Sequence, residues 1–152
     1  MGNYANKTDV PIERSKAEIE RTLVRYGAVE FVSGWDNNRA VVMFRMENRR
    51  IRFFLPMPNR DEFLYGPGGK HKRTLLQIDS AMDQAQRQRW RALGLAIKAK
   101  LEAVASGITS FESEFLAHVV MPNGKNFGEW AVPQIAESYA NKKMPPLLDA
   151  GS

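Results

Sequence analysis

Residues 29–56 read VEFVSGWDNNRAVVMFRMENRRIRFFLP, and this stretch decides the fold. Apolar and polar residues alternate through much of it, which is the pattern of strands with one buried face. Asn37-Asn38 and Glu47-Asn48 fit two-residue turns, because asparagine tolerates a positive φ. The stretch therefore predicts an antiparallel meander, with strands at about 28–35, 39–46 and 49–56.

The two turns set which residues face each other across the strands. The first turn pairs Trp35 with Ala40 and Ser33 with Val42, and the second pairs Phe44 with Ile51 and Val42 with Phe53. This register places the large apolar residues on one side of the sheet, and a slip of one residue would scatter them. The predicted apolar side consists of Val29, Phe31, Trp35, Val42, Phe44, Met46, Ile51, Phe53 and Leu55.

A helix is predicted before the meander. Ser15 and Glu18 match the S-x-x-E capping box, so the helix is expected to begin at Ser15. Its apolar residues follow at steps of three and four, and Gly27 is expected to end it.

Three helices are predicted after the meander. The apolar spacing indicates a long helix over about 80–105, opened by Ser80 and closed by Gly107. Thr109 is expected to cap a short helix, with Phe111, Phe115, Leu116 and Val119 on its apolar side. A last helix is expected over about 127–141, with Pro133 near its first turn or kinking it. The order α-β-β-β-α-α-α predicts an α+β domain of two layers, in which helices pack on one sheet face.

A chain of 152 residues fits a single domain. The ends, 1–12 and 144–152, are expected to be loosely ordered. Residues 57–78 read as a long loop, and loops of that length are often functional or mobile. It contains Gly66-Pro67-Gly68-Gly69, followed by the basic run Lys70-His71-Lys72-Arg73.

The composition excludes several chemistries. The chain has no cysteine, so disulfides and thiolate sites are absent, and its net charge of +5 suits a polyanionic partner. No export signal or apolar run of membrane-spanning length is found, which predicts a location in the cytoplasm. The two histidines, His71 and His118, form no catalytic or metal-binding motif. We therefore expect no enzyme activity, no metal and no cofactor.

The second face of the predicted sheet indicates a binding function. Arg45 and Arg50 face each other there, and because like charges repel, an anion, a carboxylate such as Glu30, or solvent must offset them. A face that mixes arginine with aromatic and apolar residues can stack bases and contact phosphates. The alternative is that a carboxyl-terminal helix covers it. The face is expected to display Val32, Val41, Met43, Arg45, Arg50, Arg52 and Phe54.

Two further basic groups stand out. Lys70, Lys72 and Arg73 lie in the predicted loop beside glycines, where they suit phosphate contact or are simply solvated. Arg87 and Arg91 are spaced i,i+4 on the long helix, which brings them to one face of it. The alternative for Arg87 and Arg91 is that they lie on an ordinary solvent-exposed face of the helix and bind no partner.

Four segments resemble a family of small uncharacterised proteins encoded by bacteriophages and prophages. The segments are Tyr26-Gly27-Ala28, residues 52–58 (RFFLPMP), residues 89–102 (RWRALGLAIKAKLE) and residues 121–130 (MPNGKNFGEW). The resemblance covers about residues 4–148. It implies a phage or prophage origin and action inside a bacterial host cell, and it transfers no activity or catalytic residue.

These observations predict a non-enzymatic phage accessory protein that associates with nucleic acid during replication or recombination. Single-stranded DNA is the favoured ligand. Two rival hypotheses remain: a protein-binding inhibitor of a bacterial defence or host complex, and a homodimer joined through the same sheet face. The expected contacts are Met43, Arg45, Arg50, Arg52 and Phe54, with Lys70, Lys72 and Arg73 from the loop and Arg87 and Arg91 from the helix.

Overall fold

The computed structural model describes residues 11–144 and has the predicted α+β class. The long helices are α1 (Ile12–Arg25), α2 (Leu75–Ala105) and α4 (Phe127–Asn141), and the strands are β1 (Glu30–Asp36), β2 (Arg39–Met46) and β3 (Arg49–Pro56). The short elements are the 3₁₀ turns η1 (Arg60–Phe63), η2 (Pro67–Gly69) and η3 (Leu116–His118), and the five-residue helix α3 (Phe111–Phe115). Within residues 11–144, no helix combines the length and apolar character that crossing a membrane requires.

The sheet has the predicted order and register. It is an antiparallel meander β1-β2-β3, in which Trp35 faces Ala40 and Phe44 faces Ile51. Asn37 and Asn48 adopt positive φ values of 56° and 60° in the two turns, as the type of turn requires.

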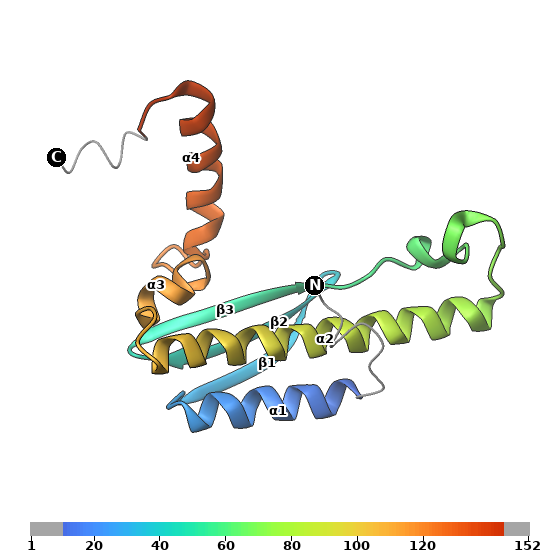
Figure 1. Cartoon of the computed structure of the whole chain (residues 1–152), viewed down its shortest axis with the longest axis horizontal. Helices are drawn as coiled ribbons and strands as arrows, with labels where there is room; N and C mark the ends of the chain where they lie inside the picture. The colour runs from blue at the N-terminus through green and yellow to red at the C-terminus, as the bar shows by residue number, and fades with distance from the viewer. Residues whose placement is uncertain (1–10, 145–152) are drawn as a thin grey trace.

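Helices α1 and α2 lie side by side on one face of the sheet (Figure 1). The strand residues that are buried beneath these helices come from β2 and β3. Val29 and Trp35 were predicted to belong to the apolar side, but they lie near the two ends of the edge strand β1 and are exposed. The core is completed by α3, whose Phe115 ring meets Phe44 edge-on at 6.0 Å between centroids. The helix side chains of this core are Ile19, Leu23, Trp90, Leu93, Ile97, Leu101, Phe111 and Phe115.

The predicted start of α1 is wrong, whereas its end is confirmed. The helix begins at Ile12 after Pro11, and Ser15 is buried inside it. Ile12 packs on the core, so an apolar contact extends the helix past the serine that resembled a cap. Gly27 ends the helix with φ 104° and donates its N–H to the Val24 carbonyl.

The start of α2 also differs from the prediction. Thr74 and Gln77 form the capping box, so the helix begins at Leu75 and the preceding loop is shorter than 57–78. Ile78 was assigned to the loop from the sequence, but it is buried. Its burial stabilises the helical turn that precedes the predicted start of α2. The helix ends at Ala105, and Gly107 follows at φ 81°, as predicted.

The carboxyl-terminal region departs from the prediction in three details. Ser110, not Thr109, caps α3, because its Oγ accepts the Ser113 N–H at 3.1 Å, and Leu116 is exposed. Helix α4 has the predicted bounds and contains Pro133, but no residue in it is buried. It contacts η3 at its first turns and extends away from the two-layer body (Figure 1). Apart from residues 11, 12 and 144, the predicted loose ends lie outside the described residues.

Candidate functional site

The sheet face opposite α1 and α2 is not covered by any helix of residues 11–144 (Figure 1). The alternative of a helix packed across this face is therefore wrong for the described chain. Cross-strand pairing arranges its side chains in rows, and the arginines outnumber the carboxylates. The rows are Glu30–Arg45–Arg50, Val32–Met43–Arg52, Gly34–Val41–Phe54 and Asp36–Arg39–Pro56.

The most ordered feature of this open face is a stack around Phe54. The Arg39 guanidinium carbon lies 3.6 Å from the centre of the Phe54 ring, and that of Arg52 lies 4.8 Å from it. Asp36 Oδ2 accepts hydrogen bonds from Arg39 Nη2 at 2.8 Å and Nε at 3.3 Å. The guanidinium of Arg39 is therefore held over the ring by a carboxylate on the neighbouring strand.

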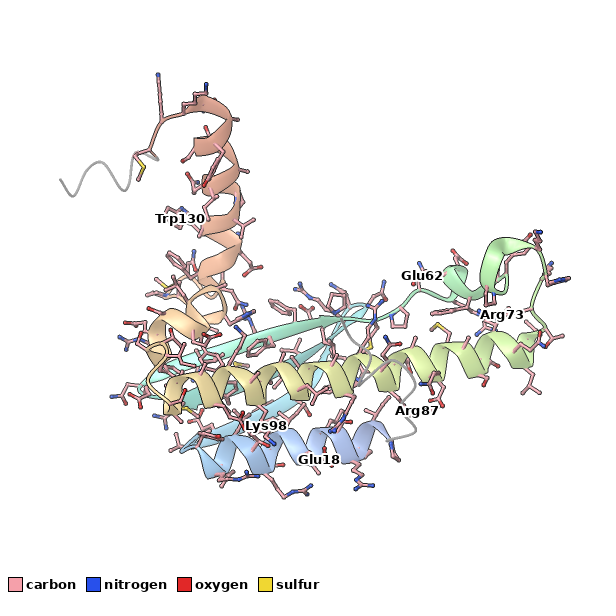
Figure 2. The ribbon with its side chains drawn as sticks, in the orientation of Figure 1. Glu18, Glu62, Arg73, Arg87, Lys98 and Trp130 are labelled. Atoms are coloured by element: carbon pink, nitrogen blue, oxygen red, sulfur yellow. The ribbon has the colours of Figure 1, made fainter. Side chains whose placement is uncertain are left out.

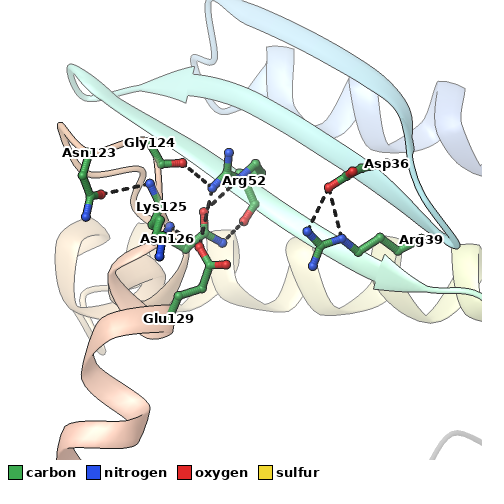
Figure 3. Close-up of polar contacts among 8 residues, drawn as sticks. All are labelled: Asp36, Arg39, Arg52, Asn123, Gly124, Lys125, Asn126 and Glu129. Carbon is green, nitrogen blue, oxygen red and sulfur yellow. Dashed lines mark hydrogen bonds and ion pairs between the residues drawn. The ribbon is translucent and has the colours of Figure 1, made fainter.

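Arg52 joins this stack to the turn before α4 (Figure 3). Its Nε donates to Asn126 Oδ1 at 3.0 Å and its Nη2 donates to the Gly124 carbonyl at 2.8 Å. Asn126 Nδ2 returns a hydrogen bond to the Arg52 carbonyl at 2.9 Å, and Glu129 lies 3.7 Å from Arg52 Nη2. The Arg52 side chain is 19% exposed, so its main role is to attach the turn to β3.

The turn forms a wall at one edge of the open face. A hollow of about 390 Å³ lies between the wall and the Phe54 stack. Its floor is Val41 and Met43, its sides include Gly124 and Lys125, and both stacked arginines border it. The hollow thus offers an apolar floor beside guanidinium planes, an arrangement suited to a flat, partly apolar ligand with negative charge nearby.

The other end of the face carries the predicted pair of facing arginines. Arg45 and Arg50 are directly opposite each other, and Arg45 Nε donates to Glu30 at 3.1 Å. Glu30 therefore offsets part of the repulsion between the two arginines that was expected from the sequence. Arg50 is exposed, and its guanidinium has no hydrogen-bonding or ionic partner within residues 11–144.

Sequence reasoning missed Arg39 and the wall. The alternation that places Val41 and Met43 on the open face also places Arg39 there, so this residue was predictable from the register alone. Nothing in the sequence indicates that Lys125 and Asn126, more than 70 positions from Arg52, lie beside it.

The remaining predicted site residues lie elsewhere (Figure 2). The basic loop lies against the amino-terminal half of α2, where Lys72, Arg73 and Arg87 border a different groove. Lys70 is exposed and does not line this groove. Arg91 donates to Glu18 of α1 at 2.9 Å, so it connects two helices of the covered layer. The structure therefore groups the basic residues into separate places and not into one continuous surface.

His118 lies at the edge of the core. Its ring stacks on Phe53 with 4.1 Å between centroids. Burial and the charge of Lys100 lower the pKa of His118, and a hydrogen bond with the Arg52 backbone partly offsets them. Among residues 11–144, no group of three or more His, Asp or Glu side chains is placed to hold a metal ion.

Comparison with known proteins identifies no relative. No protein-family model matches the sequence, and neither the curated proteins nor the solved structures contain a significant match.

Proposed function

We propose that this protein binds single-stranded nucleic acid on the open face of its sheet, as a non-enzymatic accessory factor. The observation that carries the proposal is the stack of Arg39, Phe54 and Arg52 on an uncovered sheet beside a hollow. Bases of single strands stack on aromatic rings and on guanidinium planes, whereas bases inside a duplex are already stacked.

The stack favours Arg39 as the platform for a base. Phe54 has a guanidinium close to its ring, so a base reaches the outer side of the Arg39 plane more readily than the ring itself. Because Asp36 orients Arg39, little side-chain entropy is lost when the base binds. The hollow beside it has an apolar floor for the remainder of the base.

Phosphates would contact the cations that form no ion pair with a carboxylate of residues 11–144. Lys125 borders the hollow, and Arg50 lies four residues from Phe54, or about 13 Å along β3. A short run of nucleotides spans that distance. Such contacts add affinity that depends on salt and not on sequence.

Fluorescence anisotropy with a labelled oligothymidine at 50 and 200 mM NaCl tests the proposal. Binding should weaken at the higher salt, and Arg39→Ala or Phe54→Ala should each raise the Kd about tenfold, the loss expected for one stacked base. Arg49→Ala is the matched control, since Arg49 is on the same strand but binds Glu112 at 2.7 Å, away from the open face.

Two results would overturn the proposal: no binding at 50 mM NaCl, or an equal loss in Arg49→Ala and Arg39→Ala. Duplex of the same length should bind more weakly, because its bases cannot reach the platform.

A phage origin and a role in replication or recombination in the bacterial cytoplasm belong to the same proposal. The sequence resemblance to phage-encoded proteins supports this setting. Expression of the wild-type chain and of Arg39→Ala in a bacterial host, followed by crosslinking and recovery of bound nucleic acid, checks it. Recovery of equal amounts from both proteins would contradict it.

Helix α4 favours a second candidate, the binding of a protein partner. Val132, Ile135 and Tyr139 are exposed at 63%, 54% and 83% and follow one another at helical steps of three and four. An isolated helix of this length is marginal in water, so a partner surface would stabilise it. A pull-down from nuclease-treated bacterial lysate separates the two candidates: a protein retained by the wild type and lost in Ile135→Asp supports the second.

A further inference from the structure

The loop after β3 and the amino-terminal half of α2 line a groove that the sheet site does not use. Figure 2 labels Arg73 and Arg87, two of the residues that line it. The volume of the groove is about 530 Å³. The loop is closed by main-chain hydrogen bonds, from Gly66 N–H to the His71 carbonyl and from Arg73 N–H to the Leu64 carbonyl, each 2.8 Å long. The basic loop therefore has a defined path over the helix, and its cations face a formed concavity.

The polar groups of this groove are mainly donors. Lys72, Arg73 and Arg87 supply cationic N–H groups. The carboxamide oxygens of Gln77 and Gln84 are already occupied, because they accept from the Thr74 N–H at 2.9 Å and from Arg87 Nη2 at 2.7 Å. Their NH₂ groups remain as donors toward a ligand that offers only acceptors.

Of these three cations, only Arg87 pairs with a carboxylate among residues 11–144. No Asp or Glu is among the described residues that line the groove, whereas Glu129 and Asp36 border the sheet hollow. Asp83, outside the lining, pairs with Arg87 and orients it. The Nε of Arg87 is buried and has no acceptor within residues 11–144, so the internal partners leave the guanidinium incompletely satisfied.

We propose that this groove binds a phosphate group, held by Lys72, Arg73 and Arg87. A phosphate has several acceptor oxygens and no fixed donor when ionised, which matches a concave surface of donors. Arginine forks bind phosphate oxygens in pairs. The site is separate from the sheet face, so it does not depend on the nucleic-acid proposal.

The test is an NMR titration of the ¹⁵N-labelled full chain with sodium tripolyphosphate at 50 mM NaCl. Saturable shifts are expected at the amides of residues 66–73 and at the side-chain amides of Gln77 and Gln84. Arg87→Gln should raise the Kd about tenfold, the loss typical of one charge-assisted hydrogen bond.

Two variants serve as controls. Lys98→Gln removes one charge from the same helix outside the groove, and Arg39→Ala removes the sheet platform. Both should bind tripolyphosphate as the wild type does. Shifts that do not saturate, or an equal loss in Lys98→Gln and Arg87→Gln, would refute the phosphate site. Loss of binding in Arg39→Ala would show that the groove is not an independent site.

The source of the phosphate is assigned with three further probes: adenosine triphosphate, and a thymidine trinucleotide with and without a 5′-phosphate. A Kd for adenosine triphosphate near that of tripolyphosphate assigns a small phosphorylated molecule. A preference of about tenfold for the 5′-phosphorylated trinucleotide over all other probes assigns the end of a nucleic-acid strand. Absence of binding by every probe overturns the inference.

Discussion

Phe53 and Phe54 are neighbours in β3 that point to opposite faces of the sheet. Phe53 is 6% exposed and lies among Phe44, Phe115 and His118. Phe54 is half-buried, and the guanidinium groups of Arg39 and Arg52 lie over its ring. The same residue type therefore stabilises the fold on one face and forms part of a candidate binding surface on the other.

Truncating these two phenylalanines gives the sharpest test of that difference. Phe53→Ala should lower the free energy of unfolding by about 3–5 kcal/mol, because it leaves a cavity among packed rings. Phe54→Ala should lower it by about 1 kcal/mol, since a half-exposed site with a cation–π contact loses much less. Urea denaturation measures both values. Equal losses would show that the open face is as important to stability as the covered one.

The next largest effect is expected where the open face meets its wall. Asn126→Ala should lower the free energy of unfolding by about 1–3 kcal/mol, because it removes a buried side chain that both accepts a hydrogen bond from Arg52 and donates one to it. Asn123→Ala is the matched control, since Asn123 is exposed in the same turn and, within residues 11–144, accepts only the Lys125 N–H. Hydrogen exchange of the Arg52 and Phe127 amides reports whether the wall has loosened. Similar exchange in both variants would contradict the anchoring role of Asn126.

The pH dependence of stability tests the border between the two faces. Burial and Lys100 lower the pKa of His118 below its ordinary 6.5, so the unfolded chain takes up the proton first as the pH falls. Stability should therefore decrease as the pH is lowered below about 6.5. Urea midpoints at pH 7.5 and pH 5.5 measure this, and the decrease should be smaller in His118→Gln. An unchanged pH slope in that variant would assign the effect to other groups.

The smallest change in stability is expected when Glu30 is replaced. The same substitution should also change the affinity for nucleic acid. Glu30→Gln breaks an exposed ion pair with Arg45, which contributes only about 0.2–1 kcal/mol. It also frees that guanidinium and removes a negative charge from the open face, so the Kd for oligothymidine at 50 mM NaCl should fall about two- to fivefold. Anisotropy and urea denaturation check the two expectations together. A rise in the Kd would mean that Arg45 needs Glu30 to contact the nucleic acid.

Much of the fold was predictable because its signals are local. The two asparagine turns and the alternation of apolar residues determined the strand bounds and the register, and glycines marked the ends of α1 and α2. Helix starts were less predictable. At α2, two capping patterns lie within a few residues of each other, and the one at Thr74, which precedes the buried Ile78, begins the helix. At α1, the helix begins after Pro11 without a side-chain cap, where half-buried Ile12 packs on the core.

The candidate site was predicted only in part, for a related reason. Alternation places Arg45, Arg50, Arg52 and Phe54 on one face, because that consequence follows from neighbouring positions. Whether a guanidinium is free or occupied depends on groups far along the chain. Arg50 remained available, whereas Arg52 is bound by Gly124 and Asn126.

By itself, then, the sequence determined the α+β class, the meander with its register, and a sheet face rich in arginine. Only the tertiary structure decided that this face stays uncovered, that its hollow lies against the turn before α4, and that the basic loop borders a separate groove on α2. The physical reason is that strand periodicity and turn chemistry act over a few residues, whereas ion pairs and grooves form between segments that meet only after the core has packed.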